Sequence, residues 1–188
     1  MILDSIFNRR SVLAFSNQVV EEEMLRILFE AAHLAPSSNN NQPWRFIYAT
    51  QENPAEYKLL FDCLMEGNQR WVKNAPVLIL SIAETISSYK NMPNKYAWHD
   101  IGMASVLLMV QAQALGLRSH PMGGFDPEKA KNDLQIPEPY QPVAMIALGY
   151  PGRVEDLPED LKKRETSSRN RKSLEEVVFR GKFRGLIR

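Results

Sequence analysis

The sequence predicts one domain of the α+β or α/β class, richer in helix than in strand. Four short apolar segments are typical of buried strands, and they cover 46–49, 77–82, 118–122 and 142–148. Longer segments between them repeat apolar residues at helical spacing. The chain has 188 residues, of which 44% are hydrophobic and 24% charged, which is typical of a single soluble globular core.

The predicted helices cover 4–9, 21–35, 54–66, 96–115, 127–134 and 174–178. Several have clear ends, because Pro36 stops the second helix, Gly116 ends the fourth and Asp126 is suited to cap the fifth. We expect the chain beyond Gly152 to be an extended arm, apart from the last short helix. This arm has little core of its own, so it must pack against another body, and a second subunit is the simplest one.

The cysteine and histidines do not predict a metal site. Cys63 is the single cysteine, so no intrachain disulfide is expected, and its apolar helical surroundings predict a packed thiol. His33, His99 and His120 lie far apart and show no ligand spacing with Cys63. The N-terminus has no apolar targeting region, and the near-apolar stretch 101–117 is too short to span a membrane. We therefore expect a cytoplasmic protein with no membrane partner.

Positive charge is concentrated in the C-terminal residues. Residues 162–188 hold ten Lys or Arg and three acids, a net charge of +7, whereas the whole chain carries +1. Such a segment could bind nucleic acid, bind a single phosphate group or form a solvated arm. Aromatic residues are sparse within it, only Phe179 and Phe183, which argues against nucleic acid as a partner.

Several polar groups are suited to an anionic, flat ligand. Planar guanidinium groups that match phosphate oxygens come from Arg9, Arg10, Arg169 and Arg171. The stretch 121–125, Pro-Met-Gly-Gly-Phe, leaves backbone N–H groups open to a close approach. Each feature alone is commonly a solvated helix end, a loop or a turn. The chain has no Ser-His-Asp order, paired-carboxylate signature, G-x-G-x-x-G motif or P-loop, so we expect a cofactor to supply the chemistry.

Taken in order, five blocks carry a resemblance to a known family. They are RRSV with Phe15 after it, APSSNNNQPWRF at 35–46, Asn68 and Trp71 before Ala75-Pro76, PMGGF at 121–125, and RNRKSLEEV at 169–177. This ordered set resembles the nitroreductase superfamily of FMN-dependent oxidoreductases, and especially its compact members. The resemblance spans nearly the whole chain.

The resemblance implies an α+β sandwich, with a central, mostly antiparallel mixed sheet flanked by helices. It implies a single domain over 1–188 in an intertwined homodimer, with 150–188 as an arm that packs on the partner subunit. The implied cofactor is FMN, with NADH or NADPH as co-substrate. The implied reaction is ping-pong reduction of nitroaromatics, quinones or a related conjugated acceptor. The alternative is other flavin chemistry on the same fold, such as dehalogenation, flavin destruction or regulatory flavin binding.

The resemblance also implies roles for individual residues, none of them a catalytic acid or base. The phosphate and ribityl chain would be held by Arg9, Arg10, Ser11, Arg169 and Arg171. The residues that would reach the partner's flavin are Pro36, Ser37, Ser38 and Asn40. The flavin ring would be met by Asn68 and by the loop of Pro121, Met122, Gly123 and Gly124.

Two positions depart from the family pattern. Many members carry a basic residue where this chain has Leu13, and many carry Lys where it has Trp71. Both positions lie near the N1–O2 edge of the flavin in the relatives that keep them. Because nearby cations stabilise the anionic reduced flavin, we expect this flavin to have a lower reduction potential than in relatives with both cations.

Overall fold

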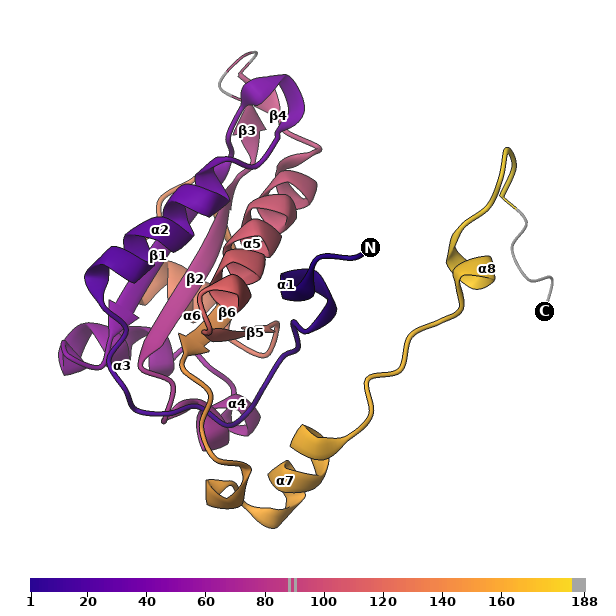
Figure 1. Ribbon diagram of the computed structural model, residues 1–188. Helices are drawn as coiled ribbons and strands as arrows, with labels where there is room; N and C mark the ends of the chain where they lie inside the picture. The colour runs from indigo at the N-terminus through magenta and orange to yellow at the C-terminus, as the bar shows by residue number, and fades with distance from the viewer. Residues whose placement is uncertain (88, 90, 184–188) are drawn as a thin grey trace.

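A four-stranded antiparallel sheet forms the centre of the molecule (Figure 1). The computed structural model describes residues 1–87, 89 and 91–183. The strand order is β1-β2-β6-β5, and the strands are β1 (Trp44–Thr50), β2 (Val77–Glu84), β5 (Arg118–Met122) and β6 (Tyr140–Gly149). A separate hairpin joins β3 (Ile86–Ser87) to β4 (Met92–Pro93). All four predicted strands are present.

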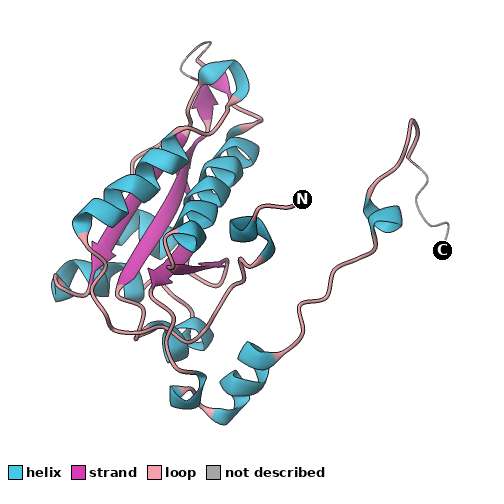
Figure 2. Ribbon diagram, viewed as in Figure 1, coloured by secondary structure: helices cyan, strands magenta, loops and turns pink. Residues whose placement is uncertain are grey.

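Helices cover both faces of this sheet (Figure 2), so the predicted α+β class is confirmed. One face packs against α2 (Glu22–His33) and α5 (Ala97–Ala114). The other face packs against α3 (Pro54–Phe61), α4 (Glu66–Val72) and α6 (Pro127–Asp133). The remaining helical segments are α1 (Asp4–Phe7), η1 (Ser38–Asn40), η2 (Val154–Asp156), α7 (Glu159–Thr166) and α8 (Leu174–Val177). No helix in the described ranges is long and apolar enough to cross a membrane.

Strand β2 shows why the sheet is buried on both sides. Its side chains alternate between the two cores, with Leu78 and Leu80 in the α3–α4–α6 cluster and Val77 and Ile79 in the α2–α5 cluster. A strand covered on both faces needs an almost continuous apolar sequence. The run Val-Leu-Ile-Leu-Ser-Ile meets this need, since its single hydroxyl, on Ser81, bonds the main chain of Ala144.

The helix predicted over 54–66 is wrong in its second half. Helix α3 stops at Phe61, and α4, which the sequence reasoning missed, begins at Glu66. The freed carbonyl groups of Phe61 and Leu64 accept hydrogen bonds from the side-chain amide of Gln69. Because these groups are satisfied inside the fold, the break costs little. The thiol of Cys63 lies buried at the break, and burial raises its pKa, so the predicted packed thiol is confirmed.

The arm predicted over 150–188 also needs correction. Its first part packs on its own chain, because Pro151 pairs with Phe15, and Leu157 and Leu161 enter the α3–α4–α6 core. Helix α7 was missed because Leu161 is its single buried apolar residue. In Figure 1 the chain runs away from the body between α7 and α8, and α8 lies within this extended stretch as predicted. Residues 184–188 of the predicted arm lie outside the described residues.

The contact at Gly152 generates a first prediction. A Cβ atom placed on Gly152 would lie 2.4 Å from the main-chain carbonyl of Phe15, which cannot move away as a flexible side chain could. Gly152→Ala should therefore lower the free energy of unfolding by about 1–3 kcal/mol, measured by urea denaturation. Gly67→Ala is the control, because no atom lies within 4 Å of its Cβ position. It should be neutral or slightly stabilising, and equal losses in the two variants would contradict the prediction.

Candidate anion-binding site

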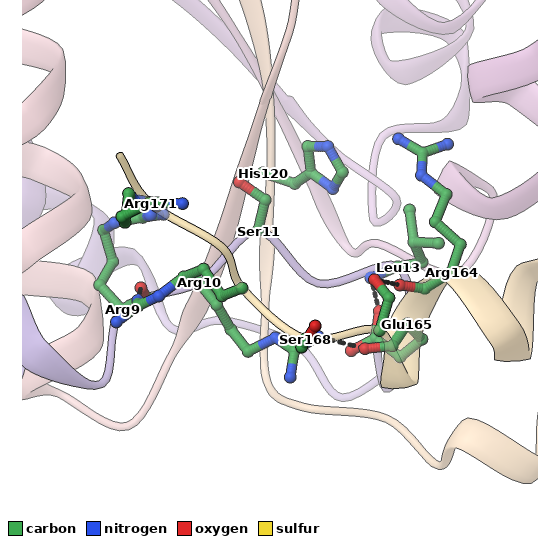
Figure 3. A pocket seen from close by; sticks show the side chains of 11 residues that line it. Arg9, Arg10, Ser11, Leu13, His120, Arg164, Glu165, Ser168 and Arg171 are labelled. Carbon is green, nitrogen blue, oxygen red and sulfur yellow. Dashed lines mark hydrogen bonds between the residues drawn. The ribbon is translucent and has the colours of Figure 1, made fainter. Parts of the chain in front are cut away.

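A polar cavity of about 300 Å³ lies between the N-terminal residues and the end of α7 (Figure 3). Five arginines and one carboxylate are among its lining residues, which are Arg9, Arg10, Ser11, Leu13, His120, Arg164, Glu165, Ser167, Ser168, Arg169 and Arg171. The fold therefore brings together the two predicted arginine groups, which are far apart in sequence. This excess of guanidinium groups favours an anion such as a phosphate monoester.

Hydrogen bonds to the main chain hold the two walls of the cavity together. Arg169 donates from its two terminal nitrogens to the carbonyl oxygens of Arg9, at 2.5 Å, and Phe7, at 2.9 Å. Arg10 donates to the carbonyl oxygen of Glu165. The Glu165 carboxylate in turn accepts the N–H of Leu13 at 2.5 Å. The segment 164–171 is therefore docked on 7–13 in one defined register.

Like charges meet at one end of the cavity. Burial, together with the neighbouring Arg169 and Arg171, lowers the pKa of Arg9. The cavity's one carboxylate belongs to Glu165, which is buried and already bonded to the main chain of Leu13. The guanidinium groups around Arg9 therefore lack an acidic partner within the cavity. A bound anion would stabilise all three arginines at once.

A buried aromatic stack lies behind the cavity, and of its three rings only His120 reaches the cavity lining. His120 stacks on Trp71 with 4.6 Å between ring centroids, and Phe15 stacks on the same indole at 6.1 Å. His120 Nδ1 donates to the carbonyl oxygen of Val12 at 2.7 Å. Burial lowers the pKa of His120, an effect that Arg164 and Arg9 reinforce and this hydrogen bond opposes. Trp71 is only 1% exposed, so its indole is packed within the fold.

The glycine loop after β5 is held by Asn68. The side-chain amide of Asn68 donates to the carbonyl oxygen of Gly124 at 2.9 Å, and the N–H of Met65 donates to the same oxygen at 3.0 Å. A Cβ on Gly124 would lie 2.7 Å from this amide nitrogen, so a side chain there would displace the Asn68 amide from the Gly124 carbonyl. A Cβ on Gly123 would meet no atom within 4 Å. The backbone at Gly123 is therefore open to a ligand.

The remaining predicted residues of this loop differ in exposure. Pro121 is exposed and Met122 is buried in the core. His120, which lines the arginine cavity, directly precedes Pro121 on β5. The loop therefore directly follows a residue of the cavity wall, but Pro121, Met122, Gly123, Gly124 and Asn68 do not themselves line the cavity.

One predicted group lies elsewhere. Pro36, Ser37, Ser38 and Asn40 follow α2 and sit beside the β3–β4 hairpin, at the opposite end of the body from α7 (Figure 1). None of them lines the arginine cavity. Ser38 donates its N–H to the buried carboxylate of Asp100 at 3.1 Å. This turn is therefore ordered within one chain but separate from that chain's cavity.

Sequence reasoning missed three kinds of residue here. Glu165, with Arg164, Ser167 and Ser168, directly precedes the predicted Arg169, and an acid standing alone among the basic residues of 162–172 was the available signal. Asp100 is a lone acid in the first turn of the apolar helix α5. His120 carried no signal beyond its place before the glycine loop. Among the described residues, no three His, Cys, Asp or Glu gather as metal ligands would.

Comparison with known proteins gives one consistent answer. The sequence profile of the Nitroreductase family matches residues 6–64 and 49–150. Protein DrgA of Synechocystis sp. is 33% identical over 183 residues, covering 82% of this chain and 85% of the relative. An NADH dehydrogenase of Thermus thermophilus is 29% identical over 175 residues, covering 76% and 83%.

A solved structure described as an oxidoreductase containing FMN superposes closely on this fold. Its TM-score is 0.92 at 37% sequence identity, and the match covers 98% of this chain and 94% of that chain. The similarity therefore includes the C-terminal segment that builds one wall of the cavity.

The buried His120 predicts an acid-sensitive fold. Since its folded-state pKa lies below its unfolded value of about 6.5, the unfolded chain binds a proton that the folded chain excludes. Stability should therefore fall as the pH drops through about 6.5. His120→Asn keeps a hydrogen-bond donor near the position of Nδ1. Between pH 7 and pH 5 this variant should lose about 1–2 kcal/mol less unfolding free energy than the wild type. Urea denaturation at both pH values measures this effect.

His33→Asn is the matched control, because His33 is exposed at the end of α2. It should leave the pH dependence as in the wild type. If both variants show the wild-type slope, His120 does not titrate as the structure implies.

Proposed function

The chain belongs to the nitroreductase family. From this premise we propose that it is an oxidoreductase that uses FMN as cofactor and NADH or NADPH as electron donor. The observation that carries the proposal is the cavity at which Arg9, Arg169 and Arg171 converge without an acidic partner. FMN carries a phosphate monoester, which is the kind of anion that this cavity favours.

The residues present fit FMN at more than the phosphate. The hydroxyl of Ser11 lines the cavity between Arg9 and His120 (Figure 3), where it can serve a polyol chain. The open backbone at Gly123 suits a flat ring, because no side chain covers it. When bound, FMN supplies the redox chemistry by accepting and releasing a hydride equivalent.

The protein's own contribution is then binding and orientation. The arginines neutralise the phosphate, and Glu165 and Arg169 fix the spacing of the two walls that carry them. Asn68 holds the Gly124 carbonyl, so the Gly123 backbone is presented in a fixed direction. The stacking of His120 on the buried Trp71 fixes the imidazole in the cavity wall.

We further propose that the working form is a homodimer. The stretch that carries α8 runs away from the body (Figure 1) and exposes apolar side chains, which are Leu174, Val177, Val178 and Phe183. The turn of Ser37 to Asn40 is ordered by Asp100 and does not line its own chain's cavity, which is compatible with a role in a neighbouring chain's site. These two features support an arm that crosses to the partner and a site that both chains complete.

The proposed acceptor is a small conjugated molecule such as a quinone or a nitroaromatic compound, reduced in a ping-pong cycle. Purified protein should be yellow and should lose its flavin absorption when NADH or NADPH is added without oxygen. Absorption should return when the acceptor is added. Initial rates at several fixed donor concentrations should give parallel double-reciprocal lines.

Each other outcome of this experiment selects a different function. Bleaching without recovery by either acceptor class favours the alternative flavin chemistries, and no bleaching favours a regulatory binder. A colourless protein that takes up no FMN would contradict the proposed function.

The arginine cavity predicts discrimination between FMN and riboflavin, which lacks the phosphate. Arg171→Gln should weaken FMN binding to the apoprotein tenfold to a hundredfold, since one charge-assisted hydrogen bond contributes about 1.5–3 kcal/mol. Riboflavin affinity should change by less than about threefold. Isothermal titration or quenching of flavin fluorescence measures both constants.

Arg153→Gln serves as the control, because Arg153 is exposed and lies outside the cavity lining. It should bind both flavins like the wild type. Equal weakening of FMN and riboflavin in Arg171→Gln would place the phosphate elsewhere.

A further inference from the structure

Arg164 stands apart from the other arginines of the cavity. Figure 3 shows its guanidinium beyond His120 and above Leu13, on the opposite side from Arg9 and Arg171. All of these residues line the same cavity. The cavity therefore has two cationic ends, separated by Ser11 and His120.

The charge interactions follow the same division. The pKa of Arg9 is lowered by its neighbours Arg169 and Arg171, and Arg164 is not among the causes. Burial is the main cause that lowers the pKa of His120, and among the neighbouring charges Arg164 contributes ahead of Arg9. The charge of Arg164 is thus felt by His120, on the Leu13 side of the cavity, rather than by the arginines at the other end.

The Arg164 guanidinium also makes no hydrogen bond or ion pair within the described part of the chain, whereas Arg169 and Arg10 are bonded to main-chain carbonyls. The acidic side chain next to it in sequence, Glu165, points to the Leu13 N–H instead. Leu13 itself brings no charge to this end. Arg164 is therefore a planar donor without a partner among the described residues, at the end of the cavity away from Arg9 and Arg171.

FMN is an asymmetric ligand with two polar ends. The phosphate is anionic in every redox state, whereas the pyrimidine edge of the ring gains negative charge only when the ring is reduced. A cation beside that edge binds the reduced form more tightly than the oxidised form, and so raises the reduction potential.

We propose that Arg164 is the cation that serves the ring end of FMN, while Arg9, Arg169 and Arg171 serve its phosphate. This inference rests on the proposed FMN site and deepens it. It assigns to a residue of α7 the role that Leu13 and Trp71, both uncharged, cannot fill. It also amends the sequence-based expectation of a low potential, because the charge arrives from a different part of the chain.

The test compares the affinities of the protein for oxidised and reduced FMN. The potential of the bound cofactor, measured by spectroscopic reductive titration against a reference dye, gives their ratio. Arg164→Gln should lower the affinity for reduced relative to oxidised FMN tenfold or more, which equals about 30 mV for a two-electron couple. Arg164→Lys should stay within about threefold of the wild type, because it restores the charge.

Lys163→Gln is the matched control. It removes the same charge one residue away on α7, and Lys163 does not line the cavity. Its ratio should match the wild type. Equal ratios in wild type and Arg164→Gln, or equal shifts in Arg164→Gln and Lys163→Gln, would overturn the role of Arg164 while leaving FMN binding intact. A wild-type protein that binds no FMN would instead overturn the proposed function.

Discussion

The docking of segment 164–171 on segment 7–13 is the constraint on which the site depends. Main-chain groups near the N-terminus need partners once they leave water, and Leu13 is almost fully buried. Glu165 and Arg169 provide those partners, although they lie more than 150 residues away in sequence. The same bonds that satisfy the backbone therefore also set the distance between two groups of arginines that would otherwise repel each other.

The parts of the fold that the sequence predicted are those with a strong local signal. Strand β2 is a continuous apolar run, and α5 is a long apolar helix ended by Gly116 with a positive φ. Helix α7 has one buried apolar residue, so no periodicity marks it. Helix α4 is separated from α3 only by a turn that Gln69 stabilises, which is a tertiary effect. Local patterns cannot supply such information.

The residues of the candidate site divide in the same way, into those that the sequence marks and those that only the fold reveals. Arginines, glycines and the Ser/Asn turn stand out by type, so their residues could be named from the sequence, although the pairing of Arg9 with Arg169 needs the fold. Glu165 and His120 could not be named, because their importance comes from what they touch. Trp71 shows the converse, since a position expected near the ligand is sealed between Phe15 and His120. A lysine there would be a buried charge in an aromatic stack, which is costly.

A cavity built from two distant segments also has a consequence for biosynthesis. Arg10 and Glu165, which contact each other across it, are 155 positions apart. At about 5–20 residues per second, a ribosome makes the second wall roughly 8–30 s after the first. During that interval the sheet and both helical layers can form, but the N-terminal arginines have no opposing wall. The cavity can therefore bind its anion only when the body is nearly complete. A chain whose cavity is occupied is one in which α7 has already been synthesised.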